Sequence, residues 1–208
     1  MRLRDTPTGY GWVSIILHWL AAAAIVALLF VGDSIGTQGD RMLRAHTTIA
    51  LLAYLVIAVR IWWRFKEGHP GPAEGQEGWS YTVGKIVHYG LVVAMAVMLV
   101  SGPLQAWSGG MPIRVFDWFT VPPPFDHHPA LFEIAHEAHV WGAITLAVGT
   151  VLHIGGVFKH TIWNRDHTLI KIFMAAKPPE DSLEENPKPA APTQRIDVAR
   201  PAEKAPGE

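Results

Sequence analysis

Four long apolar stretches, separated by polar segments, occupy most of the chain up to about residue 158. They cover about residues 12–32, 45–64, 86–107 and 138–158. The hydrocarbon core of a membrane is crossed by roughly 20 residues of α-helix. Because a backbone in lipid must satisfy its own hydrogen bonds, each stretch is predicted to be a transmembrane helix. A soluble bundle would carry polar stripes at helical spacing, and these stretches carry almost none.

The pattern therefore predicts an all-α fold, an integral membrane four-helix bundle. The second stretch is the shortest, because Arg60 interrupts it. Either Arg60 snorkels to the surface, or the helix is tilted or only partly embedded. The aromatic and proline-containing segment 108–137 is predicted to form a short interfacial helix and a cap over one end of the bundle. Residues 176–208 are rich in Pro, Ala, Glu and Lys, and we expect a disordered tail there.

Basic residues predict the orientation of the bundle. They flank the first stretch on its N-terminal side, the polar segment between the second and third stretches, and the end of the fourth stretch. The positive-inside rule then predicts a multi-pass protein of a bacterial inner membrane with both termini in the cytoplasm. The domain organisation expected is a cytoplasmic N-terminus at 1–11, the membrane domain at 12–175 and a cytoplasmic tail at 176–208. The first apolar run is too long for a signal-peptide core and is expected to be retained.

The amino-acid composition limits the cofactors and ligands that the chain can bind. The chain has no cysteine, which excludes disulfides, iron–sulfur clusters and the covalent attachment of c-type haem. A formal net charge of −1 gives no basic field for nucleic acid. A metal or haem must therefore depend mainly on the 11 histidines.

Five histidines lie within or at the ends of the apolar stretches: His18, His46, His88, His139 and His153. Ionisable residues in membrane helices are costly and usually functional. His139 and His153 are 14 residues apart, which is roughly 40° short of four helical turns and about 21 Å along the helix. Both imidazoles therefore face one side of the helix, at a separation that suits two stacked haems and not one metal.

Each haem iron needs a second axial ligand, and depth in the membrane supplies the candidates. His18 is level with His153, and His46 is level with His139, so these pairs are predicted to hold an inner and an outer haem b. Two alternatives stay open. His136 could replace His139, although it is rotated roughly 100° from the face of His153. His88 could replace His18, although we favour contact with a haem propionate or a quinone.

Further polar residues are candidates for supporting roles. Lys85, His88, His160 and Trp163 are predicted to meet beside the inner haem and to bind a quinone headgroup and relay its protons. Anchoring of helix ends at lipid headgroups explains Lys85 and His160 equally well. Arg44, Arg60 and Arg64 are candidate partners of haem propionates, or simply positive-inside charges. His127, His128 and His136 could suggest zinc, but solvated loop histidines or contacts with the outer haem are favoured.

The chain resembles the bacterial cytochrome b561 family, which includes the haem-b subunits of nickel–iron hydrogenases. The resemblance covers about residues 8–175 and rests on Ile16-Leu17-His18-Trp19, Arg44-Ala45-His46, the Arg60/Arg64 region, Gly84-Lys85-Ile86-Val87-His88-Tyr89, His136-Glu137-Ala138-His139 and Leu152-His153. It implies a four-helix bundle with two bis-histidine b haems. One branch resembles superoxide:quinone oxidoreductases, in which a corresponding lysine and histidine hold ubiquinone.

Three functions are consistent with the sequence. The first is an oxidoreductase that carries electrons between a periplasmic donor, with superoxide as one candidate, and the quinone pool. The second is a haem-b anchor subunit that exchanges electrons with a partner dehydrogenase, hydrogenase or c-type cytochrome. The third is a membrane protein without haem, whose histidines serve transport or metal binding. We favour the first, with lipid and quinone as partners and no nucleic acid.

Overall fold

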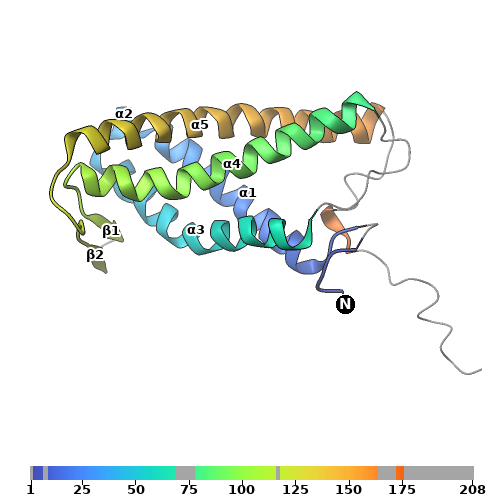
Figure 1. The fold of residues 1–208 in the computed structure, drawn as a ribbon, viewed down its shortest axis with the longest axis horizontal. Helices are drawn as coiled ribbons and strands as arrows, with labels where there is room; N and C mark the ends of the chain where they lie inside the picture. The colour runs from blue at the N-terminus through green and yellow to red at the C-terminus, as the bar shows by residue number, and fades with distance from the viewer. Residues whose placement is uncertain (1, 7–8, 69–77, 116–117, 164–171, 176–208) are drawn as a thin grey trace, which may run out of the picture. The chain divides into compact units, whose positions relative to one another are not determined.

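The structure, a computed structural model, contains four long helices and describes residues 2–6, 9–68, 78–115, 118–163 and 172–175 (Figure 1). The long helices are α1 (Trp12–Asp33), α3 (Asp40–Glu67), α4 (Trp79–Ser108) and α5 (Pro129–Phe158). A short helix α2 (Ile35–Gln38) precedes α3, and a π-helical turn η1 (Lys159–Trp163) follows α5. The tail predicted at 176–208 lies outside the described residues.

All four long helices are long and apolar enough to cross a membrane. Only 11 to 17% of the residues in their most apolar windows are buried inside the protein. Most of the apolar surface therefore faces outward, which is stable in lipid but not in water. The prediction of an all-α membrane bundle is confirmed.

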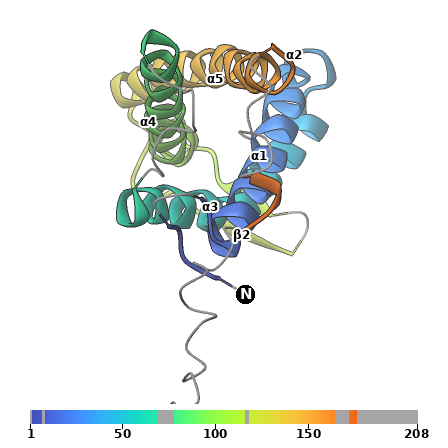
Figure 2. The ribbon, with the colours of Figure 1, turned by 90° about the vertical axis from the view of Figure 1, so that its right-hand side faces the viewer.

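The long helices form two antiparallel pairs. Helix α1 packs along α3, helix α4 packs along α5, and contacts between the two pairs are fewer. Figure 2 shows α5, α1, α3 and α4 along the four sides of a rough square. A Cβ atom at Gly142 or Gly149 of α5 would lie 2.8 Å from a side-chain atom of Met98 or Leu91, so these glycines allow α4 to approach closely.

A buried apolar layer crosses the middle of the bundle. It contains Ala21 of α1, Ala53 and Ile57 of α3, Met95 of α4 and Leu146 of α5. Leu146 lies seven residues, about two helical turns, from each of the two α5 histidines. The layer therefore separates the two levels at which histidines were predicted to meet.

Three helices begin earlier than the apolar runs suggested, at Asp40, Trp79 and Pro129. An apolar run marks the lipid-spanning part of a helix, whereas the helix itself continues until a cap or a turn ends it. At the start of α5, the His128 side chain accepts a hydrogen bond from the Leu131 amide and Pro129 occupies the first turn. Between α2 and α3, Gly39 has a φ of 56°, which favours glycine at this turn.

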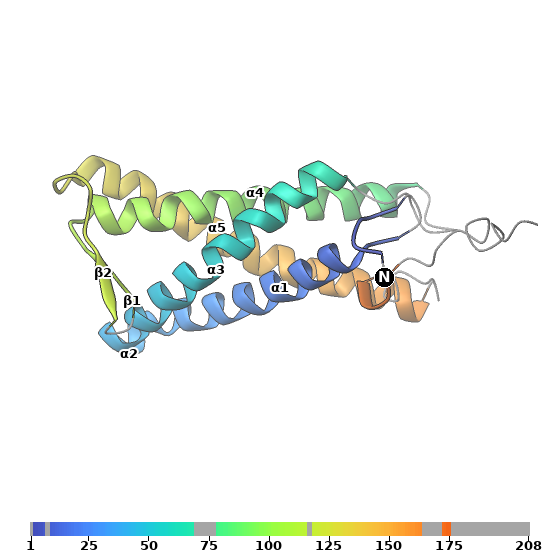
Figure 3. The same cartoon turned by 90° about the horizontal axis from the view of Figure 1, so that it is seen from below.

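The prediction of a short interfacial helix between α4 and α5 is wrong. Strands β1 (Ile113–Val115) and β2 (Phe119–Val121) form an antiparallel hairpin there. Val115 is buried, and Thr47 of α3 donates a hydrogen bond to the Arg114 carbonyl. Alternation of buried and exposed residues in this segment suits a strand, because one face packs against α3. The hairpin and α2 lie at the same end of the bundle, which we call the outer end (Figure 3).

The opposite end, where α1 begins and α5 finishes, is here called the inner end. Residues 2–6 fold back on α1, because the amides of Trp12 and Val13 donate to the carbonyls of Arg2 and Leu3. The side chain of Arg4 pairs with Glu67 of α3 at 3.3 Å. The N-terminal segment therefore joins the start of α1 to the end of α3.

Candidate functional site

Two pairs of histidines meet across the space between the helix pairs. At the inner end, the ring centroids of His18 on α1 and His153 on α5 are 6.1 Å apart. At the outer end, those of His46 on α3 and His139 on α5 are 6.2 Å apart. The interplanar angles are 58° and 75°. The structure thus brings together the residues that the sequence paired by depth.

The spacing of both pairs fits a metal held between two imidazoles. A metal–imidazole bond is about 2 Å and the nitrogen lies roughly 1 Å from the ring centre, so two axial imidazoles have centroids about 6 Å apart. Rotation of a ring about such a bond leaves the bond intact, so both interplanar angles are compatible with axial ligation. The residues present therefore fit two bis-histidine haems.

His88 of α4 is a third imidazole at the inner end. Its centroid is 4.7 Å from that of His153, with the rings nearly perpendicular. This distance is too short for an iron between them, since about 6 Å is needed. The Nδ1 of His88 donates to the Gly84 carbonyl at 3.0 Å, which fixes the ring against its own helix. The geometry favours His18 over His88 as the partner of His153.

A cation lies beside the inner pair. The Nη2 of Arg60 is 3.2 Å from the Nδ1 of His18, and its Nη1 donates to the Ser14 carbonyl at 3.4 Å. Two turns from a polar helix end, Arg60 does not simply extend to the surface as a snorkelling residue would. The partner that keeps it in the bundle comes from α1.

The outer pair has neutral surroundings. Ser101 of α4 lies with its hydroxyl 3.1 Å from the Nδ1 of His139. The Nδ1 of His46 is buried without a partner of hydrogen-bond geometry in the described part of the chain, although the Leu28 backbone lies beside the ring. A Cβ at Gly32 would lie 3.3 Å from the His46 ring, so glycine provides the room that this ring occupies.

His136, the alternative to His139, has other partners. Its Nδ1 is 3.1 Å from the Oε1 of Gln105, and its ring stacks on Phe132. Among the described residues, no cluster of three or more His, Cys, Asp or Glu side chains could hold a metal ion. His128 serves instead as the N-cap of α5. The outer histidines therefore give no support to a zinc site.

The remaining candidates are more scattered. Arg44 is exposed near the start of α3, and its carbonyl accepts a hydrogen bond from Thr47. The Nζ of Lys85 lies 5.5 Å from the centre of the Tyr81 ring, on the inner half of α4. For His160 and Trp163 the structure describes the backbone, in the η1 turn at the inner end, and not the side chains.

Arg64 contacts Tyr10, just before α1. A hydrogen bond joins the two side chains, and burial raises the pKa of the Tyr10 hydroxyl above its usual value, against the opposing effect of Arg64 and Arg60. Arg64 also donates through Nη1 to the Gly68 carbonyl at 2.6 Å, so it links the start of α1 to the end of α3.

Sequence reasoning missed three polar residues that support the histidines: Ser101, Ser14 and Asp5. Ser14 and Ser101 are almost fully buried, with 2% and 3% of their surface exposed. A hydroxyl inside an apolar helix was the available signal, since buried polar groups need partners. Asp5 gave no such signal, because it precedes the apolar stretch.

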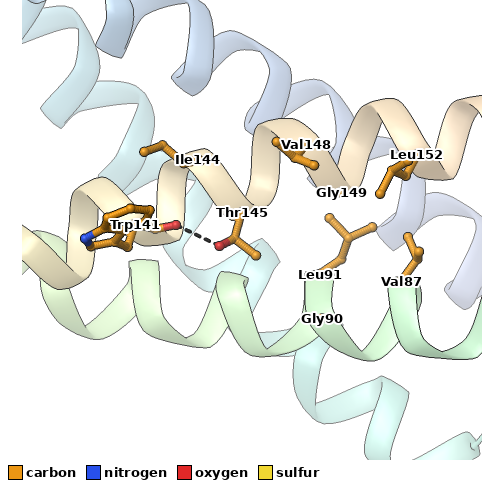
Figure 4. Close-up of a pocket in the computed structure, with 9 residues that line it drawn as sticks. All are labelled: Val87, Gly90, Leu91, Trp141, Ile144, Thr145, Val148, Gly149 and Leu152. Atoms are coloured by element: carbon orange, nitrogen blue, oxygen red, sulfur yellow. Dashed lines mark hydrogen bonds between the residues drawn. The ribbon is translucent and has the colours of Figure 1, made fainter.

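A separate apolar groove runs between α4 and α5 (Figure 4). It has a volume of about 340 Å³ and is lined by Val87, Gly90, Leu91, Trp141, Ile144, Thr145, Val148, Gly149 and Leu152. No histidine belongs to this lining, and Trp141 and Val148 are more than half exposed. The groove is therefore part of the lipid-facing surface and distinct from the histidine pairs.

Comparison with known proteins identifies the family to which the chain belongs. Residues 9–174 match the sequence profile of the prokaryotic cytochrome b561 family. The chain is 27% identical to cytochrome b561 homolog 2 of Escherichia coli (strain K12) over 175 residues, which is 81% of this chain and 93% of that protein. A match of this kind implies haem b and electron transfer, and four spanning helices in a prokaryotic cytochrome indicate an inner-membrane protein. The chain belongs to the prokaryotic cytochrome b561 family.

Proposed function

We propose that this cytochrome holds two b haems, one between His18 and His153 and one between His46 and His139, and carries electrons between them. The observation that carries the proposal is the equal spacing of the two pairs, 6.1 and 6.2 Å between ring centroids. Both distances suit an iron between two imidazoles. The resemblance to haem-b membrane cytochromes supports the same reading.

The protein's own contribution is to position the two haems and to separate them by an apolar layer. When bound, each haem supplies a one-electron iron couple. The two histidines of α5 set the levels of the sites, about 21 Å apart along one helix. The buried apolar layer that contains Leu146 lies between those levels. With two histidines bound to each haem iron, no coordination position would be left for an external molecule.

We propose further that electrons pass from a periplasmic donor at the outer end to quinone at the inner end. Superoxide is one candidate donor and ubiquinone the candidate acceptor. Lys85 and His88 lie on the inner half of α4, and the backbone of His160 and Trp163 follows the end of α5 at the same end. A cation, imidazoles and an indole suit recognition of a quinone headgroup and movement of its protons. The distribution of basic residues supports a cytoplasmic inner end with both termini there.

The first experiment is a spectrum and haem analysis of the full chain purified in detergent. We expect reducible b-type Soret and α bands, two haems per chain and low-spin iron. Absence of these bands, or a single haem per chain, would contradict the proposal. Stopped-flow mixing with superoxide and with a short-chain quinone then tests the two substrates.

The same purification tests the alternative function. A lone chain that reduces quinone supports a free-standing oxidoreductase. Stable co-purification of a dehydrogenase, hydrogenase or c-type cytochrome, with no quinone reduction by the isolated chain, would instead indicate an anchor subunit.

A further inference from the structure

The inner end of the bundle carries an arginine, Arg60, whose charge acts on three histidines there, His18, His88 and His153. Arg60 lies 3.2 Å from the Nδ1 of His18 through its Nη2. A partly buried charge acts more strongly than one in water, because little solvent screens it.

A chain of hydrogen bonds holds Arg60 in this position. Its Nη1 donates to the Ser14 carbonyl, and the Trp63 indole donates to the Ser14 hydroxyl at 2.8 Å. That hydroxyl donates to Oδ2 of Asp5 at 2.8 Å, and the Gly11 amide donates to Oδ1 at 2.8 Å. Arg60 is therefore kept near His18 even if its contact with that imidazole changes.

The local charges do not cancel. The charge of Arg64 acts on Arg60, and Asp5 is the carboxylate that acts on both arginines within the described residues. Two positive charges thus face one negative charge. Glu67, a second carboxylate beside Asp5, pairs with Arg4. Among the described residues, Asp5 is therefore the carboxylate that opposes the two arginines beside the histidine pair.

No arginine or lysine is an electrostatic neighbour of the outer histidine pair within the described residues. The electrostatic neighbours of His139 in the described residues are His46 and His136, and that of His46 is the Leu28 backbone. The hydrogen-bonding partner of His139 is the neutral hydroxyl of Ser101. The two pairs therefore offer the same ligands in different fields.

We infer that the charge of Arg60 raises the reduction potential of the inner haem above that of the outer haem. The inference rests on the proposed function, which places a haem at each pair. Reduction adds one negative charge at the site, and a nearby cation stabilises the reduced form more than the oxidised form. One electron leaves the outer iron, which goes from Fe(II) to Fe(III), and enters the inner iron, which goes from Fe(III) to Fe(II). No proton or bond has to move.

The contact with His18 makes a competing prediction. Arginine only donates, so the Nδ1 of His18 accepts in this structure. If Arg60 kept that bond while the other nitrogen bound iron, the ligand would become partly anionic and would lower the potential. In our account the single imidazole proton of His18 lies on Nδ1 whenever the other nitrogen binds iron, and Arg60 stays on the Ser14 carbonyl. Electron transfer then moves no proton. The two accounts predict shifts of opposite sign.

The test is a redox titration of the full chain in detergent, followed in the α band. The inner step is the one that disappears in His153→Ala. Arg60→Gln should shift electron occupancy away from the inner haem at least tenfold, about 59 mV for one electron, and leave the outer step in place. Arg60→Lys should keep most of the wild-type value, whereas Asp5→Asn should raise the inner potential.

An inner step that is unmoved or raised in Arg60→Gln would overturn the inference. If that variant fails to retain the inner haem, Asp5→Asn decides the question: a raised inner potential supports the inference, and an unchanged or lowered one overturns it. Haem analysis of the wild-type protein tests the proposed function independently of these variants. If the proposed function is wrong, the wild type lacks two reducible b haems.

Discussion

The inner and outer ends of this cytochrome pair the same residue type at nearly the same distance but surround it differently. The inner pair lies beside Arg60 and a third imidazole, His88. The outer pair meets the hydroxyl of Ser101. Helix α5 supplies one histidine to each end, so the difference comes from the other helices and from the N-terminal segment.

This difference shows how a nearly symmetric scaffold can acquire a direction. Histidine spacing alone fixes where two haems would be held, and it is equal at both ends. The proposed ordering of potentials depends instead on charged and hydrogen-bonding neighbours, which tune a haem site without altering its ligands. Experiments that separate the two ends are therefore the most informative.

The largest expected effect is the loss of one end by His153→Ala. Without this ligand the inner haem should be lost while most of the outer haem remains, so the haem content should fall by about half. Haem quantification and the reduced spectrum measure this. Val148→Ala is a matched control, because Val148 lies in the lipid-facing groove of the same helix. Equal loss of both haems would contradict the pairing.

The same measurements test which histidine, His18 or His88, is the second ligand of the inner haem beside His153. If His18 is the second ligand, His18→Ala should release or destabilise the inner haem, and His88→Ala should leave it low-spin. The reverse result would show that His88 moves from its bond with Gly84 to bind iron.

At the outer end, His139→Ala and His136→Ala should differ sharply. His139 faces His46, whereas His136 pairs with Gln105. The first variant should lose the outer haem. The second should keep it and lose about 1 kcal/mol of stability with one hydrogen bond. Haem content and thermal unfolding distinguish these outcomes, and loss of the outer haem in His136→Ala would reverse the assignment.

A smaller effect is expected from Ser101→Ala. The hydroxyl accepts from the Nδ1 of His139 when that nitrogen carries the proton, and so orients the ring. Loss of such a supporting bond typically weakens metal binding about 10-fold or more. Outer haem should therefore dissociate faster in a transfer assay with an acceptor apoprotein, with the inner rate unchanged. Ser108→Ala is the control, because that buried hydroxyl bonds the backbone of its own helix; an equal effect in both variants would argue against a specific role.

Much of this architecture could be predicted from the sequence, because lipid imposes simple rules. Uncharged runs marked the four helices, and the 14-residue interval in α5 placed His139 and His153 on one face. Helix ends were predicted less well. Helix α5 begins at Pro129 and includes Glu133 and Glu137, which precede the apolar run. Apolarity marks the depth of lipid and not the length of a helix.

The neighbours of the histidines were harder to predict. Arg60 looked like a surface anchor or a propionate partner, and its contact with His18 depends on Ser14 and Asp5. Arg60 meets Ser14 because α1 packs along α3, and Asp5 joins them because the N-terminal segment folds back on α1. The hairpin at Ile113–Val115 was missed for a similar reason, because a strand of three residues has too little pattern to distinguish it from a helical turn.

The smallest expected effect concerns the inner closure formed by Tyr10 and Arg64. Tyr10→Phe removes one hydrogen bond and should cost about 1 kcal/mol at neutral pH. Because burial raises the pKa of Tyr10 in the folded protein, the neutral hydroxyl is favoured by folding. Its contribution is therefore complete below the unfolded pKa of about 10 and is lost as pH rises toward the folded value. Thermal unfolding between about pH 8 and 11 should show a steeper alkaline decline in the wild type than in Tyr10→Phe. Identical slopes would mean that the closure does not depend on this hydroxyl, and a change in outer-haem retention would mean that its effect is not confined to the inner end.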